Sequence, residues 1–136
     1  MFTQMHACFA LQRVLVNQRA LFPLTPPAGS LLTVRDVLEL ATIVGARTNG
    51  LGSRIGTLTP GKEADVILLR AKHINVGPIN DAVGAVVLGM DSSNVDSVWV
   101  AGRALKRHGA LVGVHVHRLL REAEQAREAL RRRVGL

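Results

Sequence analysis

The sequence predicts an α+β fold in which helices precede and follow a β-rich middle. Apolar residues recur every three to four positions in residues 1–52, which is typical of helices buried on one face. Short apolar runs between turn residues occupy 53–112, and a helical pattern returns in 113–136. Because 136 residues leave room for one small core only, we treat these three segments as parts of one unit.

Two helices are predicted in the first segment. One spans residues 2–21, where a wide apolar stripe runs without Gly or Pro, and the proline-rich stretch 21–30 ends it as a loop. The second helix begins at Thr33, whose hydroxyl can cap the first turn, with Asp36 in the capping-box position. Its apolar residues share one face, which we expect to be buried: Val34, Val37, Leu38, Ala41 and Val44.

The middle segment is predicted to consist of short strands joined by tight turns. We expect strands at 55–58, 66–69, 95–100, 104–106 and 110–112. Gly61 after Pro60 supplies the positive φ of a type II turn, and Asp65 is expected to accept backbone hydrogen bonds in that turn. Residues 71–94 show no consistent period and are predicted to be irregular around the apolar stretch 82–90.

A final helix is predicted from Arg118 to Arg133, with a narrow apolar stripe. Acidic residues three or four positions before arginines, and arginines at the helix end, each contribute only about 0.2–1 kcal/mol. Such terms cannot hold a helix without tertiary contacts. We therefore expect this basic helix to dock on the rest of the chain, with its arginines as a solubilising cap.

Composition excludes several classes of protein. The single cysteine, Cys8, cannot form an internal disulfide, so a reducing, cytoplasmic location is expected. No run of about eighteen apolar residues is present and no basic segment precedes an apolar one at the N-terminus, so neither a membrane span nor a secretory signal is predicted.

The net charge of +7 is concentrated near the C-terminus, where residues 102–136 hold 9 basic and 3 acidic side chains. One Trp, three Phe and no Tyr offer few surfaces on which bases could stack. No helix-turn-helix, zinc-finger or RNA-binding motif accompanies the basic residues. Nucleic-acid binding is therefore not the expected function.

One sequence motif is specific enough to indicate a family. It is Pro60-Gly-Lys-Glu-Ala-Asp65, which stands directly before an apolar strand. A helix containing Ala41-Thr and Gly45-Ala precedes it, and a hairpin containing Val100-Ala-Gly-Arg follows it. With these neighbours, the stretch from Leu32 to Val112 resembles the C-terminal part of the metal-dependent amidohydrolase superfamily. It is most similar to the branch of cytosine, guanine and adenosyl-nucleoside deaminases and triazine hydrolases.

The resemblance implies a (β/α)8 barrel with a small composite β-sandwich built from both chain ends. This chain would supply terminal barrel-type helices (1–52), C-terminal strands of the composite domain (53–112) and a basic tail helix (113–136). The family hydrolyses C–N or C–Cl bonds of ring substrates with water activated by zinc or iron. Its metal ligands are a His-x-His pair, further His residues and an Asp, all at positions that we expect upstream of Met1.

No residue of this chain is therefore expected to be a catalytic, cofactor-binding or metal-binding residue, and the chain alone is expected to be inactive. His115-Val-His117 has the His-x-His spacing, and strand alternation would place both rings on one face. Two histidines fall short of the three or four ligands of a zinc site. We interpret them as exposed residues at a strand-to-helix joint, and His6, His73 and His108 as surface residues.

The alternative to an amidohydrolase part is a non-catalytic assembly or binding module. Apolar helix faces that would pack on a barrel need another cover, since large exposed apolar patches are rare. We expect either a homo-oligomer or the missing N-terminal barrel part to provide it. The residues do not indicate the substrate.

Overall fold

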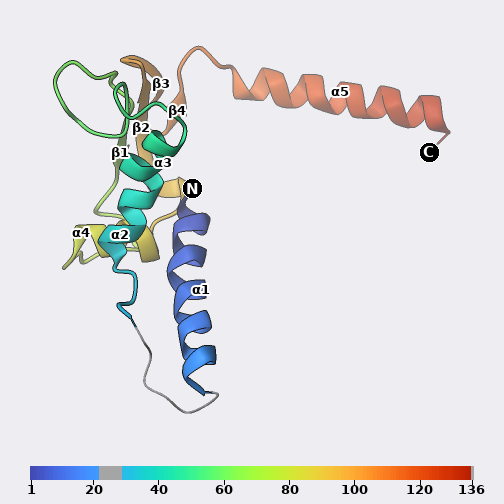
Figure 1. Cartoon of the computed structure of the whole chain (residues 1–136). Coiled ribbons are helices and arrows are strands. Elements are labelled where there is room, and N and C mark those ends of the chain that lie inside the picture. The colour runs from blue at the N-terminus through green and yellow to red at the C-terminus, as the bar shows by residue number, and fades with distance from the viewer. Residues whose placement is uncertain (22–28, 136) are drawn as a thin grey trace.

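The computed structural model describes residues 1–21 and 29–135, and it confirms a mixed fold of helices and an antiparallel sheet (Figure 1). Prolines 23, 26 and 27, predicted to lie in a loop, fall outside the described residues. The elements in chain order are α1 (Phe2–Leu21), α2 (Val34–Glu39), η1 (Leu40–Val44), α3 (Gly45–Thr48), β1 (Val66–Leu69), α4 (Ala82–Gly84), η2 (Ala85–Gly89), η3 (Ser92–Asn94), β2 (Val95–Val100), β3 (Arg103–Arg107), β4 (Ala110–Leu111) and α5 (Val116–Val134).

The elements α2, η1 and α3 form one continuous helical run whose start is the predicted capping box. The Thr33 hydroxyl accepts from the Asp36 backbone N–H at 3.2 Å, and the Asp36 carboxylate accepts from the Thr33 backbone N–H at 2.7 Å. The run widens to a π-helix at η1. Val44, at the end of η1, is exposed, so the buried face is shorter than the periodicity predicted.

The hydrophobic core lies among the helices at one end of the sheet. Its buried centre is Met5 of α1, Val37 of α2 and Val87 of η2. The helical turns at 82–89 contradict the prediction of an irregular stretch, because the Asp81 carboxylate accepts from the backbone N–H groups of Val83 and Gly84 and caps them. Within the described residues, only seven are buried: Met5, Val37, Ala46, Val87, Met90, Asn94 and Ser97.

The sheet has four antiparallel strands in the order β1-β2-β3-β4. In β1 and β2, Val66 pairs with Trp99, and the register shifts between Leu68 and Leu69. The predicted type II turn before β1 is confirmed, since Gly61 has a φ of 90° and the Lys62 N–H donates to the Thr59 carbonyl at 3.1 Å.

The predicted strand at 55–58 is wrong, because residues 55–57 form bends and Gly56 lies against the helical run at Ala46. The Lys62 ammonium donates to the backbone carbonyls of Gly52 and Ile55, at 2.6 and 3.2 Å. These two hydrogen bonds hold the segment in place. The described segment therefore follows the helix surface and does not extend the sheet.

The final helix forms as α5, but the expectation that it docks on the chain is wrong. Figure 1 shows α5 extending away from the sheet and the helical core. Every residue of α5 is exposed, including Leu119, Leu120 and Leu130. Its predicted stripe consists of Leu119, Ala123, Ala126 and Leu130, so little apolar area is available to hold it against the described part of the chain.

The chain exposes far more surface than a compact protein of its size. Its accessible surface is 10339 Å² for a mass of 14.6 kDa, whereas folded monomers of that mass expose about 6,900 Å². None of the helices in the described residues is long and apolar enough to cross a membrane. The division of the chain into the segments 1–52, 53–112 and 113–136 stays a prediction.

Candidate functional site

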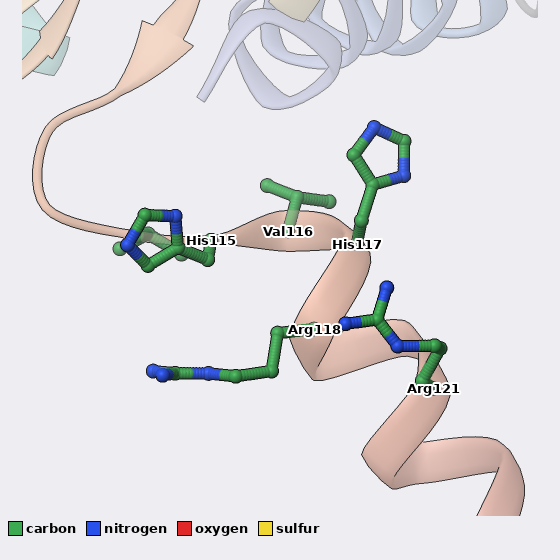
Figure 2. A pocket seen from close by; sticks show the side chains of 6 residues that line it. His115, Val116, His117, Arg118 and Arg121 are labelled. Carbon is green, nitrogen blue, oxygen red and sulfur yellow. The ribbon is translucent and has the colours of Figure 1, made fainter.

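The His115–His117 pair lies at the start of α5, beside an open hollow of about 530 Å³. His115 is the N-cap residue, with φ −91° and ψ 84°, and His117 stands in the first helical turn. In Figure 2 the two imidazole rings lie apart, with Val116 between them. The prediction that strand alternation places both rings on one face is wrong, because the helix begins between them. Their predicted place, an exposed strand-to-helix joint, is confirmed.

These residues do not fit the zinc or iron of the resembling family. No group of three or more His, Cys, Asp or Glu side chains that could hold a metal occurs in the part of the chain that the structure describes. Arg118 and Arg121 line the same hollow, and their positive charges disfavour a cation there. The expectation that this chain supplies no metal ligand stays a prediction, and no chemical step is assigned to these histidines.

A fully buried polar side chain, Asn94, was missed in the sequence. Its carbonyl oxygen accepts from the Asn75 amide at 2.8 Å and from the Asp91 backbone N–H at 3.0 Å. Its amide donates to the Asn75 side-chain oxygen at 3.0 Å and to the Arg70 carbonyl at 3.4 Å. Asn94 therefore ties the end of β1 to the loop at 75 and to the start of η3, which is a structural role.

A charged cluster on the sheet centres on Asp96. The Arg70 guanidinium donates to its carboxylate at 2.9 Å, the Ser97 hydroxyl at 2.7 Å, and the His108 ring nitrogen lies 3.8 Å away. The hydrogen bond from Ser97, followed by that from Arg70, lowers the pKa of Asp96 below its ordinary value. Arg70 and Asp96 belong to segments 26 residues apart, so this cluster joins β1 to β2.

We expect acid to destabilise the fold partly through Asp96. Because the pKa of Asp96 is lowered on folding, its stabilisation is present at neutral pH and is lost as the pH falls through the folded-state pKa. Urea unfolding of wild type and Asp96→Asn, followed by fluorescence of Trp99 between pH 7 and pH 2, measures this. The free energy of unfolding of the variant is expected to fall less on acidification than that of the wild type. If it falls equally in both proteins, Asp96 does not contribute to the loss of stability in acid.

The motif from Pro60 to Asp65 has a structural role, because it fixes the hairpin between β2 and β3. The Asp65 carboxylate accepts from the backbone N–H of Ala101 at 2.7 Å, and Gly102 N–H donates to the Ala64 carbonyl at 3.0 Å. Asp65 was expected to bond within its own turn, but it fixes the β2–β3 hairpin 36 residues further on. Glu63 pairs with Arg54, an exposed contact on the other side of the turn.

This arrangement of helices, turn and hairpin is that of a known family. Residues 1–105 match the model of the amidohydrolase family, so the chain belongs to that family. This confirms the resemblance that the motif from Pro60 to Asp65 indicated. It is 35% identical over 130 residues to a 5-methylthioadenosine/S-adenosylhomocysteine deaminase from Desulforudis audaxviator. It is also 35% identical over 82 residues to an S-triazine hydrolase from Gordonia rubripertincta.

Solved structures share the fold. An adenosine deaminase from Xanthomonas campestris with bound zinc superposes with a TM-score of 0.80 over 96% of this chain and 28% of that one, at 24% identity. An atrazine chlorohydrolase from Arthrobacter aurescens complexed with zinc superposes with a TM-score of 0.62 at 22% identity. This match covers 70% of the present chain and 21% of the chlorohydrolase chain. The curated relatives are likewise longer than this chain. The match with the Desulforudis protein covers 96% of this chain but 28% of that protein. The match with the Gordonia protein covers 60% of this chain and 17% of that protein.

Proposed function

We propose that the chain is the C-terminal portion of an amidohydrolase that hydrolyses non-peptide C–N bonds, with deamination of a nucleobase-like ring as the reaction. The similarity to the Desulforudis protein, which is named a deaminase, supports the reaction class. The observation that carries the proposal is that 96% of this chain corresponds to only 28% of a deaminase from Desulforudis audaxviator. The large exposed surface agrees with a unit that packs against further polypeptide.

In this proposal the chain contributes structure and no chemistry. The helices α1 and α2–η1–α3 complete a barrel, and the sheet joins the composite domain. An open groove of about 330 Å³ between these helices marks the face that further polypeptide would cover; it is lined by Met1, Gln4, Met5, Cys8, Val37, Leu40 and Ala41. The metal and its ligands belong to the remainder of the fold, so the chain alone is expected to show no hydrolase activity.

A chimera tests the proposal. The segment of the Desulforudis deaminase that matches this chain is replaced by residues 1–136, and a matched control receives the corresponding segment of the Acetivibrio thermocellus deaminase. We expect the chimera to bind zinc and to release ammonia from 5′-methylthioadenosine within about tenfold of the control, while the isolated chain does neither.

Two results would contradict the proposal. One is an inactive, insoluble chimera beside an active control, which would mean that this chain cannot complete the fold. The other is deaminase activity of the isolated chain with stoichiometric zinc that is lost in the His115→Ala/His117→Ala variant. That second result would place the catalytic site in this chain.

A further inference from the structure

The helical run from α2 to α3 ends in an exposed Asn-Gly pair. Asn49 is the residue that follows α3, and Gly50 has a left-handed φ of 71°. In such a pair the backbone nitrogen of glycine can attack the side-chain carbonyl carbon of asparagine, because glycine carries no Cβ that hinders the approach. The chain contains this dipeptide once. Asn49 is therefore the asparagine of this chain with the least hindered nucleophile beside it.

That nucleophile, the Gly50 backbone nitrogen, is held within the cap of the helix. The Gly50 N–H donates to the Arg47 carbonyl at 3.0 Å, and the Leu51 N–H donates to the Ala46 carbonyl at 2.8 Å. With a glycine in the left-handed conformation between them, these two bonds form the Schellman motif that closes many helices. The nitrogen that would attack Asn49 is thus occupied as a hydrogen-bond donor.

The backbone conformation also keeps the two reacting atoms apart. The attack closes a five-membered ring, for which the Gly50 nitrogen must lie on the same side of the Cα–C bond as the Cβ of Asn49. With a ψ of 8°, it nearly eclipses the backbone nitrogen of Asn49 instead. The Asn49 side-chain amide is itself bonded, since it donates to the Gly45 carbonyl at 2.8 Å. The reaction therefore requires the last turn of the helical run to open.

We propose that Asn49 is a deamidation site that the Schellman motif protects in the folded chain. When the turn opens, the Gly50 N–H gives its proton to water, and its nitrogen forms a bond to Cγ of Asn49. The C–N bond of the side-chain amide breaks, and that nitrogen takes up a proton and leaves as ammonia. Water then opens the cyclic imide at either carbonyl carbon, which gives aspartate or isoaspartate at position 49. The net reaction consumes one water and releases one ammonia.

The product weakens the helix cap that delayed its formation. A carboxylate cannot donate to the Gly45 carbonyl, and its negative charge at the C-terminal end of the helical run is unfavourable. Isoaspartate also adds a methylene group to the main chain between positions 49 and 50, which changes the spacing that the Gly50–Arg47 hydrogen bond needs. Deamidation of Asn49 therefore loosens the end of α3.

Peptide mapping of the full chain by mass spectrometry tests the site. Trypsin cleaves after Arg47 and Arg54, and in the peptide 48–54 the only amide side chain is that of Asn49. We expect this peptide to gain about 1 Da at least about tenfold more slowly in native buffer than in urea, since the reaction needs the cap to open. Asn49→Gln, in which the attack would close a six-membered ring, should show no gain in the same period.

Two variants of Leu51 test the protection by the cap. Leu51→Pro removes the N–H that donates to the Ala46 carbonyl, and the matched control Leu51→Ala keeps it. In native buffer we expect Leu51→Pro to deamidate at least about fivefold faster than Leu51→Ala, whereas in urea the two should react at the same rate. Fluorescence of Trp99 checks that both variants are folded.

Hydrogen exchange of the Gly50 N–H in the wild type gives a test that does not depend on the folding of a variant. Its protection should equal the factor by which native buffer slows deamidation, because both reactions need the same bond to open. Unequal factors, no mass gain in urea, equal wild-type rates in native buffer and urea, or equal rates for folded Leu51→Pro and Leu51→Ala would overturn the proposal. None of these results depends on the proposed function, which the chimera tests separately.

Discussion

Replacing Asn94 by leucine is expected to lower the free energy of unfolding by about 2–4 kcal/mol, although leucine is apolar and close in size. The variant removes every partner that Asn94 provides in a fully buried position. The hydrogen bonds that Asn94 makes with the Asn75 side chain, the Asp91 backbone N–H and the Arg70 carbonyl are then lost together. Each contributes about 0.5–1.5 kcal/mol, and their sum exceeds the gain from burying an apolar side chain here.

The measurement is urea unfolding followed by Trp99 fluorescence, because Trp99 lies in β2, the strand that begins directly after Asn94. Asn49→Ala is the matched control: Asn49 is exposed and makes one side-chain hydrogen bond, to the Gly45 carbonyl at 2.8 Å. The control is expected to cost less than about 1 kcal/mol. Equal losses for the two variants would show that Asn94 is not a structural centre.

Features whose signal and partner lie close in the sequence were predictable. The capping box needs only Thr33 and Asp36, and the type II turn needs only Pro60 and Gly61. The helical turns after Asp81 also had a local signal, the capping carboxylate, but the stretch is too short to show a period.

Features that depend on distant partners were not predictable in this way. Asn94 stands in a turn-like sequence, and its burial depends on Asn75, 19 residues away. Residues 55–58 have the composition of a strand, yet Gly56 lies against Ala46 of the helical run and the Ile55 carbonyl accepts from Lys62. The Asp65 carboxylate bonds a hairpin that no local pattern connects to it.

The position of α5 shows a different reason for a wrong prediction. The local terms that stabilise α5 are weak, so we expect this helix to need a tertiary contact. The described part of the chain does not provide that contact, since every residue of α5 is exposed. We expect that contact to come from further polypeptide, as in the proposed function.

Substituting alanine for Gly56 is expected to destabilise the fold by about 2–5 kcal/mol. Gly56 has a φ of +92°, a conformation that costs a residue with a Cβ about 1–2 kcal/mol. The added Cβ would also lie 2.7 Å from the Cβ of Ala46, which is buried in α3, and 3.3 Å from the Thr42 carbonyl oxygen. Relieving this overlap requires a shift of the helix or of the loop, at about 1–3 kcal/mol.

Gly61→Ala separates the two contributions, because Gly61 has a φ of +90° but nothing within 4 Å of an added Cβ. It should show the backbone strain alone, so Gly56→Ala should be the more destabilising of the two. Ala46→Gly removes the atom that the new Cβ would meet, so we expect Gly56→Ala to cost less in an Ala46→Gly background than in the wild type. A cost that is unchanged by Ala46→Gly would mean that the loop does not press on the helix at this point.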